Sequence, residues 1–222
     1  MNEVLEQFKK IGIIPVVVLD DAKDAKPLGQ ALMEGGLPCA EVTFRTEAAE
    51  ESIRILTKEF PDMLVGAGTV LTTEQVDRAV AAGAKFIVSP GINPKIVDYC
   101  VKKNIPITPG TCNPSNVETA LEFGLDVVKF FPAEPAGGLK YIKAIAAPYT
   151  GVCFMPTGGI NAENVKEYLK YDRIIALRRL FQQHLVAGLH QRVHILQLVF
   201  VHKRSQTGHF QFHCHCKLHL LT

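Results

Sequence analysis

Eight short β-rich runs that alternate with amphipathic segments predict an α/β fold, a (β/α)8 barrel of the TIM type whose eighth βα unit is disrupted. The runs are nearly evenly spaced from residue 13 to residue 176, and turn glycines such as Gly83 and Gly124 come just before the next run. Strands that alternate with helices form right-handed parallel βαβ units. An open doubly wound sheet is the alternative architecture, but such sheets more often have five or six strands.

The eight predicted strands are rich in β-branched and other apolar residues. In chain order they are Ile13–Leu19, Cys39–Arg45, Leu64–Val70, Lys85–Pro90, Pro106–Pro109, Val127–Pro132, Cys153–Thr157 and Arg173–Ala176. Between them, apolar residues recur at helical spacing in segments such as Thr46–Phe60, Thr73–Ala82 and Asn161–Leu169. Each strand is therefore followed by a helix that returns the chain to the start of the next strand.

The composition is that of one soluble globular domain, with 222 residues of which 47% are hydrophobic and 21% charged. Charged residues interrupt the first ten residues, so the signature of a signal peptide is missing, and no apolar run reaches the length of a membrane span. We therefore expect a cytoplasmic protein with no membrane partner. The 6 cysteines are scattered rather than dense, which favours reduced thiols.

Charge divides the chain into two unlike parts. The chain has 24 basic and 22 acidic residues, but all the acidic ones lie at or before Asp172, and all 8 histidines lie between His184 and His219. Residues 177–222 hold six of the basic residues, so the formal charge is 18 − 22 = −4 for residues 1–176 and +6 for the remainder. We expect a barrel domain over residues 1–176 and an atypical basic, histidine-rich tail, non-native or poorly ordered, over residues 177–222.

Two charged residues lie inside otherwise apolar strands. Glu41 and Lys129 belong to the second and sixth predicted strands, which are diametrically opposed in an eight-stranded ring. A single lysine or glutamate in such a strand usually lies at an edge or is paired. Both together on opposed walls, with Arg45 on the same strand face as Glu41, indicate a functional pair because buried charges cost free energy.

The chemistry of this pair is that of an imine-forming lysine. Desolvation among valine and phenylalanine side chains, with a cation such as Arg45 nearby, lowers the proton affinity of Lys129. A neutral amine can attack a ketone and form an imine, which draws electrons from the adjacent carbon and lets a carbon–carbon bond break. Glu41 is the candidate carboxylate for the accompanying proton transfers.

Further candidate substrate-binding residues stand at strand ends. Arg45 offers the planar fork that binds a 2-keto acid carboxylate. Glycine-rich ends at residues 66–69, 109–111 and 157–159 allow the backbone to approach a ligand. Gly158 and Gly159 follow the seventh strand, where phosphate sites in barrels are commonly built.

With these residues identified, the chain resembles the bacterial 2-keto-3-deoxy-6-phosphogluconate (KDPG) aldolase family, which includes the 4-hydroxy-2-oxoglutarate (KHG) aldolases. The resemblance covers roughly residues 5–176 and consists of several ordered motifs. They are Glu41-Val42-Thr43-Phe44-Arg45-Thr46, Val65-Gly66-Ala67-Gly68-Thr69-Val70, Ser89-Pro90-Gly91, Lys129-Phe130-Phe131-Pro132-Ala133-Glu134 and Pro156-Thr157-Gly158-Gly159-Ile160.

The resemblance implies a class I aldolase that cleaves 2-keto-3-deoxy-6-phosphogluconate to pyruvate and glyceraldehyde 3-phosphate, or 4-hydroxy-2-oxoglutarate to pyruvate and glyoxylate. It implies a homotrimer that acts on a small-molecule 2-keto acid without a metal or other cofactor. Lys129 is then the Schiff-base residue and Glu41 the general acid/base. The implied substrate-binding residues are Arg45, Thr69, Pro90, Phe131, Thr157, Gly158 and Gly159.

The resemblance stops after Ala176, where the family pattern has a Gly-Gly-Ser type of loop and a final helix. This chain has Leu177-Arg178-Arg179-Leu180 instead. If these residues are encoded CTG CGG CGG CTC followed by T, reading one base later gives Cys-Gly-Gly-Ser. We therefore interpret the tail as the product of a frameshift near codon 177, with a divergent natural tail as the alternative.

The tail contains residue types that occur at metal and nucleic-acid sites. His213-Cys214-His215-Cys216 contains the usual zinc ligands, but without their paired spacing, so no metal site is expected. The basic tail lacks a nucleic-acid motif, so no nucleic-acid partner is expected. The remaining alternatives are a catalytically impaired aldolase-like protein with an incomplete phosphate site and a non-aldol barrel enzyme such as an epimerase.

Overall fold

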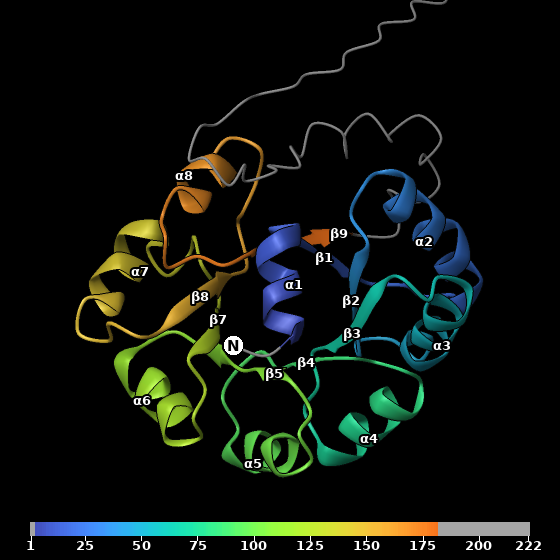
Figure 1. The fold of residues 1–222 in the computed structure, drawn as a ribbon, viewed down its shortest axis with the longest axis horizontal. Helices are drawn as coiled ribbons and strands as arrows, with labels where there is room; N and C mark the ends of the chain where they lie inside the picture. The colour runs from blue at the N-terminus through green and yellow to red at the C-terminus, as the bar shows by residue number, and fades with distance from the viewer. Residues whose placement is uncertain (1–2, 182–222) are drawn as a thin grey trace, which may run out of the picture.

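A computed structural model describes residues 3–181, and within them parallel strands form a barrel (Figure 1). One sheet has the order β5-β4-β3-β2-β1-β9 and the other the order β6-β7-β8. The strands are β1 (Ile13–Val17), β2 (Cys39–Thr43), β3 (Leu64–Gly68), β4 (Ile87–Val88), β5 (Ile107–Thr108), β6 (Gly110–Thr111), β7 (Val127–Phe130), β8 (Cys153–Pro156) and β9 (Leu177–Phe181).

The two sheets join into one ring at two seams. β5 and β6 are halves of a single barrel strand separated only by Pro109. At the other seam, isolated parallel bridges connect Phe154 with Ile174 and Thr157 with Arg178, and β9 pairs with β1 along its whole length. The predicted eight-stranded barrel is confirmed, and the open sheet is not formed.

The helices surround this ring, apart from α1, which lies across its centre in Figure 1. Their bounds are α1 (Glu3–Ile11), η1 (Ala22–Asp24), α2 (Ala25–Glu34), α3 (Ala49–Glu59), α4 (Thr73–Ala81), α5 (Pro94–Lys102), α6 (Pro114–Glu122), α7 (Gly138–Ala146) and α8 (Val165–Leu169). Among the described residues, no helix is both long enough and apolar enough to cross a membrane.

Local sequence signals explain several helix ends. The side chains of Thr72 and Asn113 accept hydrogen bonds from the backbone N–H groups of Gln75 and Asn116, which caps the starts of α4 and α6. Gly83 and Gly124, predicted to end helices, have φ angles of 104° and 73°. Glycine adopts this left-handed conformation at little cost, so the chain can leave the helix and enter the next strand.

The eighth strand extends further along the chain than predicted. The predicted run Arg173–Ala176 pairs with Phe154 of β8 through the bridge at Ile174 and through backbone hydrogen bonds of Arg173 and Ile175, whereas β9 occupies Leu177–Phe181. The prediction ended this strand too early because it followed composition, while residues 177–181 pair with the edge of β1 and close the ring. The first five residues of the predicted tail therefore belong to the barrel, and the domain boundary after residue 176 is corrected to a position beyond β9.

The remainder of the predicted tail lies outside the described residues. This applies to residues 182–222, and so to the histidine-rich stretch, the sequence His213-Cys214-His215-Cys216 and whatever follows the eighth strand.

The barrel has an outer and an inner apolar layer. Val42, Val128 and Phe130 pack toward the helices, as strand alternation predicts. The inner layer contains Phe8 from α1 together with strand residues such as Ile14 and Phe86, and the rings of Phe8 and Phe86 meet edge to face with centroids 4.8 Å apart. Since α1 leads directly into β1, Phe8 closes the end of the lumen where the strands begin, leaving the opposite end for the site.

Candidate active site

The lumen contains three charged side chains that are almost completely removed from solvent. Glu41 on β2 is 1% exposed, Lys129 on β7 is 5% exposed and Arg178 on β9 is 0% exposed. The sequence predicted the first two to face each other, and the structure places both inside the ring. Three such charges in one apolar lumen are costly unless they interact or react.

Lys129 lies in an apolar setting that favours the free amine. Its ammonium nitrogen lies 4.8 Å from the centroid of the Phe131 ring, so these two residues share the lumenal face as predicted. Burial lowers the pKa of Lys129 to about 8, against the opposing effect of the Glu41 carboxylate, and the positive charges of Arg178 and Arg45 lower it further. A measurable fraction of Lys129 is therefore neutral near pH 7.

The Glu41 carboxylate fits against a glycine. A Cβ atom on Gly68 of the neighbouring strand β3 would lie 2.2 Å from Glu41 Oε1, closer than any real contact allows. The motif Gly66-Ala67-Gly68 thus provides the space into which the carboxylate turns. The sequence indicated close approach of a ligand at this motif, whereas the structure shows close approach of the Glu41 side chain.

Arg178 is the buried lumenal charge that sequence reasoning missed. Its Nε atom lies 3.1 Å from Glu41 Oε2, and its Nη2 atom donates a 2.6 Å hydrogen bond to Thr108 Oγ1 on β5. Its guanidinium carbon is 5.9 Å from the Phe8 ring centroid. The prediction assigned this residue to a non-native tail, although the alternation of Leu177, Arg178 and Arg179 could have indicated that one arginine faces inward.

The ion pair between Glu41 and Arg178 leaves hydrogen-bonding capacity unused. Within residues 3–181, Glu41 Oε2 and the Nε and Nη1 atoms of Arg178 have no hydrogen-bond partner, because the 3.1 Å contact lacks hydrogen-bond geometry. Thr157 Oγ1, on the strand that bridges to Arg178, is also buried without a partner. Unpaired buried polar atoms are rare, so this cluster is suited to receive oxygen atoms of a ligand.

Arg45 and Thr69 form a second polar pair at the ends of β2 and β3. Arg45 is exposed, and its Nε atom donates to Thr69 Oγ1 over 3.2 Å. Thr69 has a φ of 56°, a left-handed conformation that a β-branched residue rarely adopts. Strained backbone of this kind is concentrated at functional positions, and the substrate-binding roles of Arg45 and Thr69 stay predictions.

Pro90 and Phe131 follow β4 and β7, and both are partly buried. A Cβ atom on Gly110 would lie 2.0 Å from the Pro90 carbonyl oxygen, so the backbones of these two strand ends touch. The hydroxyl of Ser89 donates to the Gly91 carbonyl over 2.7 Å and holds the turn around Pro90. The turn is therefore fixed beside the strand that leads toward Thr111.

The turn after β8 carries the predicted phosphate residues. Gly158 and Gly159 have φ angles of 98° and 81°. The backbone N–H groups of Ala133 and Glu134 donate to the carbonyls of Thr157 and Gly158 over 2.8 and 3.0 Å, which joins this turn to the end of β7. A Cβ atom on Gly159 would lie 2.4 Å from Glu134 Cβ, so only glycine fits there.

Taken together, the fold and the site define a class of protein. A buried lysine of lowered pKa, a carboxylate in the same closed lumen and polar groups at the C-terminal ends of the strands are the parts of a barrel enzyme that works through a lysine imine. This is the class of the Schiff-base, or class I, aldolases, which are carbon–carbon lyases.

Comparison with known proteins gives the family. A family model for the KDPG and KHG aldolases matches residues 4–183. The 2-dehydro-3-deoxy-phosphogluconate aldolase of Haemophilus influenzae is 51% identical over 175 residues, which cover 79% of this chain and 82% of that protein. The 2-dehydro-3-deoxy-phosphogluconate aldolase of Treponema pallidum is 50% identical over 176 residues, which cover 79% of this chain and 84% of that protein. The chain belongs to the KDPG and KHG aldolase family.

A solved structure agrees with this assignment. The KDPG aldolase of Legionella pneumophila, described with pyruvate captured as a covalent carbinolamine intermediate, has a TM-score of 0.82 and 37% identity, covering 89% of this chain and 96% of that one. A carbinolamine is the adduct that precedes an imine. The comparison therefore supports class I chemistry on this fold.

Proposed function

We propose that this chain cleaves 2-keto-3-deoxy-6-phosphogluconate to pyruvate and glyceraldehyde 3-phosphate, and 4-hydroxy-2-oxoglutarate to pyruvate and glyoxylate as a second reaction. The observation that carries this proposal is the pairing of a desolvated Lys129, 5% exposed, with the buried Glu41 carboxylate in one lumen. Membership of the aldolase family supports the choice of substrates.

The chemical steps follow from these two groups. The neutral amine of Lys129 attacks the C2 ketone, and loss of water leaves a protonated imine. Glu41 takes the proton of the C4 hydroxyl while the C3–C4 bond breaks, so that the bond electrons enter an enamine and the aldehyde leaves. Glu41 then returns a proton to C3, and water hydrolyses the imine to free pyruvate and Lys129.

The binding roles extend the predictions from sequence. Arg45, positioned by Thr69, binds the substrate carboxylate as a planar cation. Phe131 and Pro90 form the walls beside the reacting carbons. The hydroxyl of Thr157, which is buried without a partner, forms a hydrogen bond with the substrate. Gly158 and Gly159 approach the phosphate end through their backbone.

We also propose that the protein acts as a homotrimer in the cytoplasm. The family resemblance is the support for the trimer, and the lack of a membrane-spanning helix among residues 3–181 is compatible with the location. Sedimentation of the purified protein tests the trimer, because a monomer of 24.4 kDa and a trimer separate clearly.

Reductive trapping tests the catalytic assignment. Incubation with pyruvate and sodium borohydride should add a pyruvate-derived mass to the peptide that contains Lys129. Lys129→Met should abolish the adduct, whereas Lys140→Met, which removes an exposed lysine on α7, should leave it intact. Trapping on another lysine, or none in the unmodified protein, would overturn the proposal.

A further inference from the structure

Arg178 extends from β9 into the lumen and contacts β2, which is separated from β9 only by β1, and β5, which is farther along the ring. It reaches Glu41 on β2 with Nε and Thr108 on β5 with Nη2, above the Phe8 ring of α1. Its guanidinium therefore lies between the closed end of the barrel and the two catalytic groups. No role for this residue follows from the motifs of the family.

We infer that Arg178 is a positioning residue that competes with Lys129 for the Glu41 carboxylate and thereby sets the pH range over which Lys129 reacts as a free amine. The inference rests on the proposed function, because it concerns the lysine that forms the imine. Arg178 lies outside the sequence motifs on which the family resemblance depends, the last of which ends at Ile160.

The geometry supports a competition for one carboxylate. Glu41 is 1% exposed, so water cannot replace a lost partner, and Arg178 occupies its Oε2 atom at 3.1 Å. The protonated forms of Lys129 and Arg178 together bring two positive charges to one negative charge. Since a guanidinium keeps its proton more strongly than an amine, the excess positive charge is relieved by deprotonation of Lys129.

The charges that face Lys129 come from three places. Glu41 on β2 favours the ammonium form, whereas Arg178 on β9 and Arg45 after β2 disfavour it, with the effect of Arg178 ahead of that of Arg45. Arg178 itself faces Glu41 and the thiol of Cys39, both on β2. Removing the Arg178 charge therefore frees Glu41 to stabilise the ammonium form, and both changes raise the pKa of Lys129.

A neutral substitution tests this role. Arg178→Met keeps an apolar stem and removes the charge, and Arg178→Gln is a second neutral variant whose end group is polar. The rate of pyruvate trapping by borohydride at Lys129 is measured against pH. The midpoint of the profile should rise by about one pH unit relative to the unchanged protein, so that trapping near pH 7 falls about tenfold.

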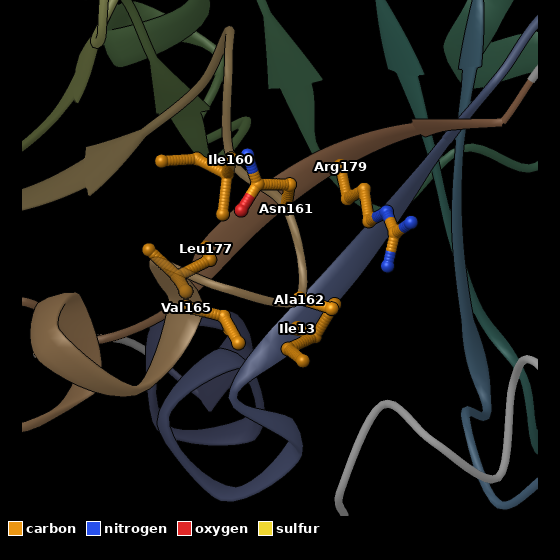
Figure 2. Close-up of a pocket in the computed structure, with 7 residues that line it drawn as sticks. All are labelled: Ile13, Ile160, Asn161, Ala162, Val165, Leu177 and Arg179. Carbon is orange, nitrogen blue, oxygen red and sulfur yellow. The ribbon is translucent and has the colours of Figure 1, made fainter.

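Arg179→Met is the matched control. Arg179 is the next residue of β9, so strand alternation directs its side chain to the opposite face. There it lines a pocket together with Ile13 and Asn161 (Figure 2). This variant makes the same change in net charge outside the lumen, so its trapping profile should coincide with that of the unchanged protein. Thermal melting of all variants identifies any that do not fold.

A second readout separates this inference from the proposed function. Acetylation of Lys129 by acetic anhydride, followed by peptide mass spectrometry across the pH range, reports its titration without pyruvate. An upward shift in folded Arg178→Met or Arg178→Gln supports the inference even when no pyruvate adduct forms. An unchanged or lowered midpoint in both neutral variants, or an equal shift in Arg179→Met, would overturn it while trapping of pyruvate on Lys129 still stands.

Discussion

The Glu41 carboxylate lies where a side chain on Gly68 would be, with only 2.2 Å between Oε1 and a Cβ atom placed on that glycine. Glu41, the proposed general acid/base, and the adjacent strand β3 therefore fit closely against each other. An enzyme that needs one carboxylate to exchange protons with both a hydroxyl and a carbon benefits from such restriction, because small displacements of a catalytic group are costly.

We expect Gly68→Ala to reduce turnover by about 100-fold, since the added methyl group displaces the carboxylate from the reacting atoms. Gly151→Ala is the control, because a Cβ atom there meets nothing within 4 Å. Steady-state cleavage of the phosphorylated substrate measures the effect. Full activity in folded Gly68→Ala would contradict the proposed position of Glu41 during catalysis.

Lys129 should give the enzyme an acidic limb in its pH profile, in which the rate falls as the pH drops below the pKa of this lysine. With a pKa of about 8, the free amine falls about tenfold for each pH unit below that value and is fully formed above it. The rate of imine formation should rise up to about pH 8 and then level off. A profile that is flat between pH 6 and pH 9 would contradict the assignment of Lys129 as the attacking amine.

Lys129→Met should be inactive but more stable than the unchanged protein at pH 7. Because the pKa of Lys129 is lowered on folding, burial of the charged lysine opposes folding below about pH 8. This free-energy penalty decreases as the pH rises from about 8 toward 10.5, the pKa at which the lysine of the unfolded chain also loses its proton. Glu41 keeps Arg178 as its partner in the variant. Melting temperatures should differ most at neutral pH and converge at high pH, whereas a less stable variant at pH 7 would refute this account.

Arg45→Lys should raise KM for the keto acid by about 10- to 100-fold and change kcat little, because a lysine loses the planar fork and the hydrogen bond to Thr69. Arg54→Lys is a suitable control, as Arg54 is an exposed residue of α3 that pairs with Glu50 and Glu51 on the same helix. Initial rates over a range of substrate concentrations separate the two constants. If Arg45→Lys lowered kcat and left KM unchanged, the proposed role of Arg45 in binding the substrate would be wrong.

Gly159→Ala should weaken binding of the substrate phosphate without affecting imine formation at Lys129. The new Cβ atom would lie 2.4 Å from Glu134 Cβ, so the turn must shift, and KM for the phosphorylated substrate should rise by about tenfold or more. Trapping with pyruvate should be unaffected. Gly124→Ala has the same left-handed strain, with a φ of 73°, but no contact within 4 Å, and should leave both readouts unchanged.

The frameshift interpretation predicts that a protein with Cys-Gly-Gly-Ser at residues 177–180, continued in the same shifted frame, is more soluble and more active. Backbone N–H groups of the new loop would donate charge-assisted hydrogen bonds to the substrate phosphate and so raise kcat/KM. We expect this gain to exceed the decrease in kcat/KM that follows when removal of Arg178 lowers the fraction of Lys129 present as the free amine. Expression yield and kcat/KM measure both effects. Equal solubility and activity of the two proteins would refute the interpretation.

Much of the fold could be predicted because periodicity reports burial. Strand alternation placed Glu41 and Lys129 on the lumenal face and Val42 and Val128 on the outer face, as observed. The end of the eighth strand could not be located from composition, because Arg178 and Arg179 make this segment polar. These residues are in a strand because they pair with β1. The partner of Glu41 escaped prediction for the same reason.

By itself, the sequence determined the order of strands and helices, the lumenal or outer face of residues such as Glu41 and Val42, and the presence of a buried lysine and a buried carboxylate in the lumen. Only the tertiary structure decided that Arg178 lies 3.1 Å from Glu41 and that Gly68 makes room for the carboxylate. The physical reason is that residue patterns encode whether a side chain is buried, while the identity of its neighbour depends on how distant strands meet when the ring closes.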